Sequence, residues 1–390
     1  MVPGGRLFGG RDVRYGGAMQ RAADTRPEWL ARELAALVTP GPRLLDEVEC
    51  IVSVLLAILI AHGIGATNVS WAAFSGYMVM RSHLSESMLR GVLRIIGTAL
   101  GAAMALTLVP AVAGSTPLVS LVGALIGAAT LYGALTGRNA YGWLFIGLTF
   151  EMILYGAVEH PGHALLPFAA TRIAEVVAGT AACLIVNVVS QFTARRRWPV
   201  GTSPAPRLPG GWHPHAARHA AQAALALALI PWLWHAWHIP ELAQSTVTVM
   251  AVLLVPMSSM GTHGFALVGR RLVYRIAGCL SGAVLAAVFL IAGRGHAVPL
   301  IVGTALGVFI GRHIENGRGD RAYIGTQFTL AILVTLVPDS YAIAEIGPAR
   351  ERLIGILIGM AVLVPVMGLW RVIWPGEAAP GAGQSGSLDA

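Results

Sequence analysis

Residues 90–102 read RGVLRIIGTALGA, and residues 271–283 read RLVYRIAGCLSGA. Both stretches follow one pattern, Arg-x-x-x-Arg-Ile-x-Gly-x-x-x-Gly-Ala, and each continues into a further apolar run. The copies are 181 residues apart in a chain of 390 residues, so their offset is a little under half its length. A long pattern that recurs at such an offset predicts an internal duplication.

In a helix, the two arginines of each stretch would lie one turn apart, as would the two glycines. Small residues at this spacing allow a second helix to approach closely inside a membrane. We therefore predict arginine pairs at a membrane surface, each followed by a helix-packing face. The predicted packing residues are Gly97, Gly101, Gly278 and Gly282.

The composition is that of a membrane protein, with 55% hydrophobic and only 12% charged residues. A soluble domain carries about a quarter charged residues. All 27 basic residues are arginine, and the absence of lysine excludes both a P-loop ATPase and Schiff-base chemistry on lysine. We interpret the formal net charge of +8 as the arginine excess of cytoplasmic loops, without a nucleic-acid partner.

Twelve apolar segments predict an all-α, polytopic membrane helix bundle of about twelve transmembrane spans. Residues 66–80, 244–260 and 297–311 are shorter than a full span of ~20 residues, which indicates tilted, broken or re-entrant helices. The segments are 48–64, 66–80, 92–112, 117–136, 141–158, 167–190, 219–237, 244–260, 273–292, 297–311, 322–337 and 350–370.

The arginine distribution predicts the topology. If both termini are cytoplasmic, 23 of the 27 arginines lie on the cytoplasmic side, as the positive-inside rule requires. The exceptions are Arg172, Arg294, Arg350 and Arg352. Because each half has an even number of spans, the two six-span repeats would be parallel, related by an axis along the membrane normal.

The predicted domain organisation has five parts. Residues 1–42 form a cytoplasmic tail with an amphipathic helix near 25–38, and residues 373–390 form a disordered tail. The two membrane repeats occupy residues 43–190 and 219–372. A cytoplasmic linker, residues 191–218, joins them and is too short for a folded domain.

A further similarity concerns the fifth and eleventh segments. Residues 146–150 read IGLTF and residues 324–328 read IGTQF. Aligned on these residues, Thr329 of the second half lies opposite Glu151 of the first. We therefore expect any site at Glu151 to be asymmetric between the halves.

Three motifs together carry a resemblance to a known family. These are the tryptophan-containing segment 71–76 (WAAFSG), the stretch 90–102, and the arginine-led segment 172–179 (RIAEVVAG). They resemble the fusaric acid resistance family, also described as the aromatic acid exporter family, over about residues 43–190 and more loosely over 216–370. The resemblance implies a bacterial inner-membrane transporter that exports aromatic carboxylic acids, with a periplasmic adaptor and an outer-membrane channel as partners. The family also resembles plant anion channels gated by aluminium or malate.

Five residues are candidates for transport. Glu151 lies in the middle of the fifth segment, where an unpaired charged carboxylate costs several kcal/mol, and we interpret it as a proton-coupling group. A structural interhelical hydrogen bond is the alternative. Arg172 and Glu175, three residues apart, could anchor an anion and relay a proton, or form a local ion pair. Arg94 and Arg275 could attract organic anions, or orient the spans and pair with lipid phosphates.

No catalytic or metal-binding pattern is evident, so we expect no enzyme, cofactor or metal site. The chain is therefore predicted to be a multi-pass inner-membrane protein with both termini cytoplasmic, exporting small organic anions with the proton gradient as driving force. Its expected partners are the lipid bilayer and the anion, and a homodimer stays open. Two alternatives also stay open: a passive organic-anion channel, and an envelope scaffold that transports nothing.

Overall fold

The computed structural model describes residues 35–37, 39–198, 211–238, 242–255, 264–293, 296–317, 321–341 and 346–373. These residues contain helices and no strand. Residues 1–40 are a unit separate from Gly41–Ala390, and the helices discussed below all belong to the latter. Most of the predicted amphipathic helix, the middle of the linker and the C-terminal tail lie outside the described residues.

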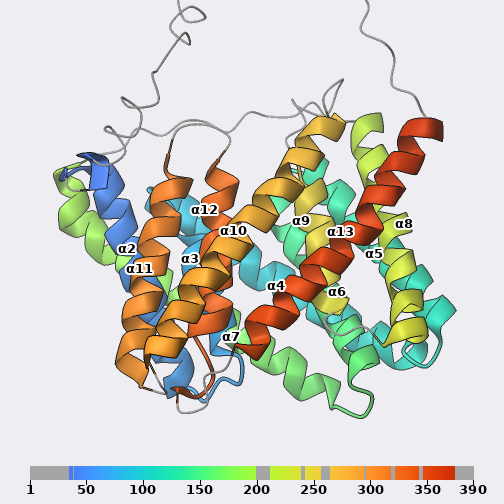
Figure 1. The fold of residues 1–390 in the computed structure, drawn as a ribbon, viewed down its shortest axis with the longest axis horizontal. Coiled ribbons are helices and arrows are strands. Elements are labelled where there is room, and N and C mark those ends of the chain that lie inside the picture. Colours follow the sequence, from blue (N-terminus) through green and yellow to red (C-terminus); the bar gives the residue numbers. More distant parts are fainter. Residues whose placement is uncertain are drawn as a thin grey trace, which may run out of the picture. The chain divides into compact units, whose positions relative to one another are not determined.

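Twelve α-helices and one 3-10 turn are described between residues 42 and 373, and each predicted apolar segment overlaps one α-helix (Figure 1). The first half contains α2 (Pro42–Gly63), α3 (Val69–Val79), α4 (Leu84–Val112), α5 (Thr116–Thr136), α6 (Ala140–Glu159), α7 (Leu165–Phe192) and the turn η1 (Ala194–Arg196). The second half contains α8 (Pro214–Trp237), α9 (Leu242–Leu253), α10 (Gly264–Gly293), α11 (Ala297–Glu315), α12 (Ala322–Leu336) and α13 (Gly347–Ile373).

Seven of the described helices are long and apolar enough to cross a membrane, namely α4, α5, α6, α7, α10, α11 and α13. Helices α9 and α12 are apolar but shorter. The predicted all-helical, multi-pass membrane protein is therefore confirmed. The expectation of short segments holds for α3 and α9, which have 11 and 12 residues, whereas α11 has 19 residues.

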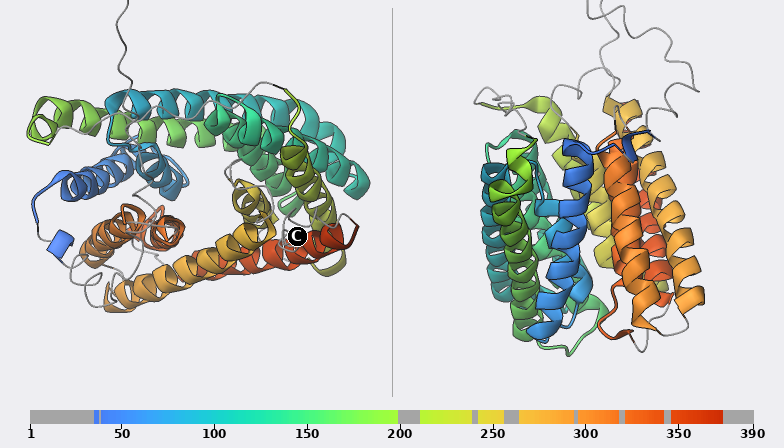
Figure 2. Two further views of the ribbon diagram at one scale, coloured as in Figure 1. Left: turned by 90° about the horizontal axis from the view of Figure 1, so that it is seen from above. Right: turned by 90° about the vertical axis from the view of Figure 1, so that its left-hand side faces the viewer.

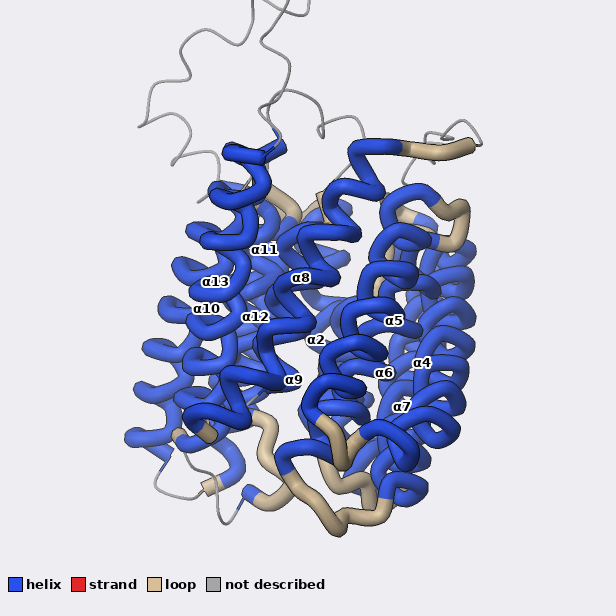
Figure 3. Tube along the Cα trace, turned by 90° about the vertical axis from the view of Figure 1, so that its right-hand side faces the viewer, coloured by secondary structure: helices blue, strands red, loops and turns tan. Residues whose placement is uncertain are grey.

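Similar helix contacts recur in the two halves. Helix α4 packs on α6 and α3 on α7, while α10 packs on α12 and α9 on α13. The halves meet where α5 packs on α8 (Figure 3), α2 on α11 and α6 on α9, with a smaller contact between α3 and α12. In the view from above in Figure 2, α2 and α3 (blue) lie beside α11 and α12 (orange).

The glycines of the repeated pattern lie where helices touch. A Cβ at Gly97 or Gly278 would be 2.6 Å from the carbonyl oxygen of Gly142 or Ile324, respectively. A Cβ at Gly282 would be 2.5 Å from a carbonyl oxygen of α12, and one at Gly101 would meet a carbonyl oxygen of α6. Only a residue without a side chain fits such contacts, so these glycines hold α4 against α6 and α10 against α12.

These contacts correct the expected alignment of α6 with α12. Ile146 is the residue whose carbonyl meets the second glycine of α4, and Phe328 is its counterpart on α12. The glycine contacts thus pair Ile146 with Phe328, whereas the similar motifs pair Ile146 with Ile324. The true correspondence of α6 with α12 is therefore displaced by about one helical turn from the alignment of the motifs. Glu151 consequently corresponds to Leu333, and the prediction of Thr329 was wrong, because glycine packing rather than local sequence likeness sets the register. The expected asymmetry is still present, since leucine replaces a carboxylate.

Candidate functional site

A cavity of about 190 Å³ lies among helices of both halves. Its lining residues come from α3, α4, α6 and α7 and from the matching helices α9, α10, α12 and α13, together with Leu254 just after α9. Among the described lining residues, none is acidic and five are arginines: Arg94, Arg172, Arg271, Arg275 and Arg352. The lining surface is mostly apolar, and the five guanidinium groups surround it with positive charge.

Arg94 lines the cavity from α4 and is only 2% exposed. Its Nε donates a hydrogen bond to Ser75 Oγ at 3.0 Å, and Nη1 donates to the hydroxyl of Tyr141 at 3.2 Å. Its guanidinium carbon is 4.0 Å from the ring centroid of Phe145. The predicted transport arginine of the first half is thus held by two hydroxyls and an aromatic face.

Arg275, the matching residue on α10, is 1% exposed and has different partners. Its Nη1 donates to Gln327 Oε1 at 2.7 Å and to the hydroxyl of Tyr323 at 3.4 Å. Its Nε and Nη2 are buried and have no hydrogen-bond partner among the described residues. A buried donor without a partner costs free energy, so these two nitrogens are suited to a ligand acceptor.

Arg172 and Glu175 form the ion pair expected from their spacing on α7, with 3.2 Å between Nη1 and Oε2. The guanidinium carbon of Arg172 also lies 4.5 Å from the ring centroid of Trp71. Glu175 accepts a hydrogen bond from the backbone nitrogen of Asn68 at 3.0 Å. Only Arg172 of this pair lines the cavity.

Two further arginines line the cavity without having been predicted as transport residues. Arg352 of α13 donates to Gln244 Oε1 at 3.4 Å and lies 5.4 Å from the ring centroid of Phe74. Arg271 of α10 donates to the carbonyl oxygen of Leu254. The sequence placed both arginines near the ends of spans. The positive-inside rule was a sufficient explanation for Arg271, whereas Arg352 was one of its exceptions.

Glu151 lies outside this cavity. It is fully buried on α6 against Gly123 and Gly127 of α5, and neither oxygen has a hydrogen-bond partner among the described residues. The neighbouring Tyr155 donates its hydroxyl hydrogen to the carbonyl oxygen of Leu227 in α8, at 3.2 Å. Of the five predicted transport residues, the structure therefore brings Arg94, Arg172 and Arg275 to one cavity and leaves Glu151 and Glu175 out of its lining.

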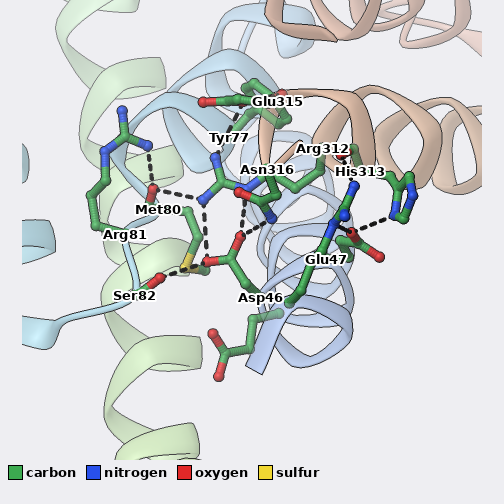
Figure 4. Close-up of polar contacts among 12 residues, drawn as sticks. Asp46, Glu47, Tyr77, Met80, Arg81, Ser82, Arg312, His313, Glu315 and Asn316 are labelled. Atoms are coloured by element: carbon green, nitrogen blue, oxygen red, sulfur yellow. Dashed lines mark hydrogen bonds and ion pairs between the residues drawn. The ribbon is translucent and has the colours of Figure 1, made fainter. Parts of the chain in front are cut away.

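A second polar cluster joins α2 to α11 (Figure 4). Asp46 accepts hydrogen bonds from Arg312 Nε at 2.7 Å and from Asn316 at 2.8 Å. Glu47 lies 2.8 Å from a ring nitrogen of His313. These pairs are about 270 residues apart in the chain, so no local sequence signal could have paired them.

The same cluster continues to the end of α7. Glu49 of α2 pairs with Arg195 of η1, whose guanidinium also donates to the carbonyl oxygen of Ser82. Tyr77 of α3 donates to Glu315 of α11 at 2.5 Å. The contact between α2 and α11 is thus ionic at this end, whereas α5 meets α8 through apolar residues such as Leu131 and Leu227.

Comparison with known proteins bears on the first half of the chain. Residues 49–200 match the fusaric acid resistance protein family. This match confirms the resemblance that segment 71–76 and stretch 90–102 predicted. Neither a curated protein nor a solved structure matches the chain.

Proposed function

We propose that this protein of the fusaric acid resistance family exports small organic anions, with aromatic carboxylates as the best-matched class. The observation that carries the proposal is the cavity between matching helices, lined by five arginines and by no described acidic residue. Guanidinium groups bind carboxylates through paired, charge-assisted hydrogen bonds and also pack on aromatic faces. The cavity is lined by arginines and by aromatic side chains such as Trp71 and Phe145, so it suits a small ring that carries a carboxylate.

The proposal includes twelve spans in a bacterial inner membrane, as two parallel repeats at residues 43–190 and 219–372 joined by the linker 191–218. It is supported by the recurring helix contacts of the two halves and by the overlap of each predicted segment with one helix. Both termini would then be cytoplasmic, and the α2–α11 cluster would lie at the cytoplasmic end. A periplasmic adaptor and an outer-membrane channel would receive the anion outside, and a homodimer is compatible with this scheme.

The proposed driving force is the proton gradient, and Glu151 is the proposed coupling carboxylate. Because it lies between α5, α6 and α8 rather than at the cavity, it would act through helix packing and not by touching the anion. Protonation would remove the cost of a buried charge, so proton uptake and release would change the balance of helix arrangements. The pair of Arg172 and Glu175 is the second candidate for coupling.

A passive anion channel is the second candidate function. One observation favours it: no described carboxylate lines the cavity, so no proton-exchanging acid would meet the anion there. In a channel, the anion would follow its own electrochemical gradient, and charge removal at Glu151 would leave its flux unchanged. An envelope scaffold would need no arginine-lined cavity.

Flux of 4-hydroxybenzoate in proteoliposomes distinguishes these functions, with protein-free liposomes giving the background of passive permeation. We expect an imposed pH gradient to drive accumulation by the wild-type protein. Glu151→Gln should abolish this accumulation while leaving downhill flux, and Glu86→Gln, at an exposed position of α4, is the matched control. Downhill flux that ignores the pH gradient in the wild type would establish the channel, and flux no greater than background would refute both functions.

A further inference from the structure

The two walls of the cavity differ in chemistry at matching positions. Arg94 packs on the ring of Phe145, whereas Arg275 bonds to the amide of Gln327. A Cβ at Gly97 of α4 would meet the Cβ of Phe145 on α6, and a Cβ at the matching Gly278 of α10 would meet the Cβ of Gln327 on α12. These two residues therefore occupy equivalent places, one aromatic and one an amide.

The same exchange occurs at the second pair of arginines. Arg172 lies on the ring of Trp71, and Arg352 bonds to the amide of Gln244. A Cβ at Gly179 of α7 would meet Ala72, the residue directly after Trp71. A Cβ at Gly359 of α13 would meet Ser245, the residue directly after Gln244. Arg94 and Arg172 thus each contact an aromatic ring, where the equivalent Arg275 and Arg352 each hydrogen-bond to a glutamine.

Arg172 on the aromatic wall has a buried Nε without a hydrogen-bond partner among the described residues, but its Nη1 is paired with Glu175. The two adjacent donors that suit a carboxylate are those of Arg275, on the glutamine wall. The Nε and Nη2 atoms of one guanidinium are the two parallel donors that bind a carboxylate in bidentate geometry. In Arg275 both atoms lack a hydrogen-bond partner among the described residues, while in Arg94 the Nε atom already donates to Ser75. Arg275 is almost fully buried and lines the cavity, so a ligand in the cavity could offer an acceptor to these donors.

We infer that an aromatic acid binds in one orientation, with its carboxylate on Arg275 and its ring toward the wall of Trp71 and Phe145. Gln244 and Gln327 would then hydrogen-bond to the carboxylate or to polar substituents of the ring. This inference rests on the proposed function and adds the direction in which the ligand lies. It also gives Arg94 and Arg275, which occupy the same position of the repeated pattern, different roles: Arg275 binds the carboxylate and Arg94 does not.

The first test compares the two arginines by equilibrium dialysis of purified protein in lipid nanodiscs, with benzoate, cyclohexanecarboxylate and propionate as probes. Arg275→Gln should weaken binding of all three acids about tenfold or more, because it removes a charged bidentate donor. Arg94→Gln should weaken binding about threefold or less, because the protein already satisfies that Nε. Equal losses for the two variants would overturn the inference.

Two conservative substitutions to lysine control for the possibility that the glutamine variants fail to fold. Gel filtration and thermal melting of each variant report whether it is folded. Arg275→Lys keeps the charge but loses the two parallel donors, so it should still weaken binding of all three acids about fivefold. Arg94→Lys should weaken binding of all three acids by about twofold or less, a smaller loss than that of Arg275→Lys. If Arg275→Lys binds as the wild type does, the carboxylate is not received there.

The second test concerns the ring, measured as the affinity for benzoate relative to that for propionate. Phe145→Leu should lower this ratio about fivefold, because it removes an aromatic face from the proposed ring side. Gln327→Leu should change the ratio by less than about twofold, although it weakens both acids. The reverse result would place the ring on the other wall.

The outcomes separate the inference from the proposed function. Wild-type protein that binds none of the three acids would refute both together. Wild-type protein that binds and transports aromatic acids, with equal effects at the two arginines, would refute only the proposed orientation.

Discussion

Substitution of Gly282 tests whether close helix contact determines stability. A Cβ at this position would lie 2.5 Å from the carbonyl oxygen of Phe328 and 3.0 Å from the Cβ of Ala331, both on α12. Since non-bonded heavy atoms reach their optimum near 3.5 Å, α10 and α12 would have to separate by roughly 1 Å. Helices in a membrane associate largely through such packing, so Gly282→Ala should destabilise the fold by about 1–3 kcal/mol.

The assay is thermal melting of the purified protein in detergent, with Gly269→Ala as the matched control. Gly269 lies on the same helix, and a Cβ there would meet nothing within 4 Å. Alanine also favours a helix over glycine by up to about 1 kcal/mol, so the control should melt at or above the wild-type temperature. For Gly282→Ala the melting temperature should fall by at least about 2 °C, and Gly282→Leu should reduce the yield of folded protein.

The first half offers an independent repeat of this experiment. Gly101→Leu should reduce the amount of folded protein for the same reason, because its Cβ would meet the carbonyl oxygen of Ile146 on α6. Equal melting temperatures for Gly282→Ala and Gly269→Ala would refute the reasoning. They would mean that α10 and α12 can part without loss, and that the glycine pattern serves another purpose.

Two further predictions concern the ionic contact and the topology. Because removing one partner of a buried ion pair costs about 3–5 kcal/mol, Arg312→Gln should lower the melting temperature strongly. Adding Asp46→Asn should restore part of the loss, and purely additive effects in this double-mutant cycle would contradict a direct pair. In a cysteine-free background, Gly114→Cys should react with a membrane-impermeant maleimide from the periplasmic side and Arg138→Cys should not. Labelling of residue 138 from outside would contradict the proposed orientation.

The sequence determined where the helices are and which glycine faces of two helices lie against a neighbour. Long apolar segments predicted α2 to α13 because hydropathy is a property of each segment alone. The glycines at 97, 101, 278 and 282 predicted close packing because their spacing places them on one helix face, whatever the neighbour is. The motifs of residues 71–76 and 90–102 were also sufficient to predict the family.

The tertiary structure alone decided which side chains meet. Periodicity gives the face of a helix, but the rotation and register of the helix packed against it depend on contacts from distant parts of the chain. For this reason the sequence could not place Phe145 and Gln327 at equivalent positions beside two matching arginines. It could not show that Glu151, the carboxylate deepest in its predicted span, faces α5 and not the cavity. Nor could the sequence pair Asp46 with Arg312, because the two residues are 266 positions apart and the local sequence around either one does not depend on the other.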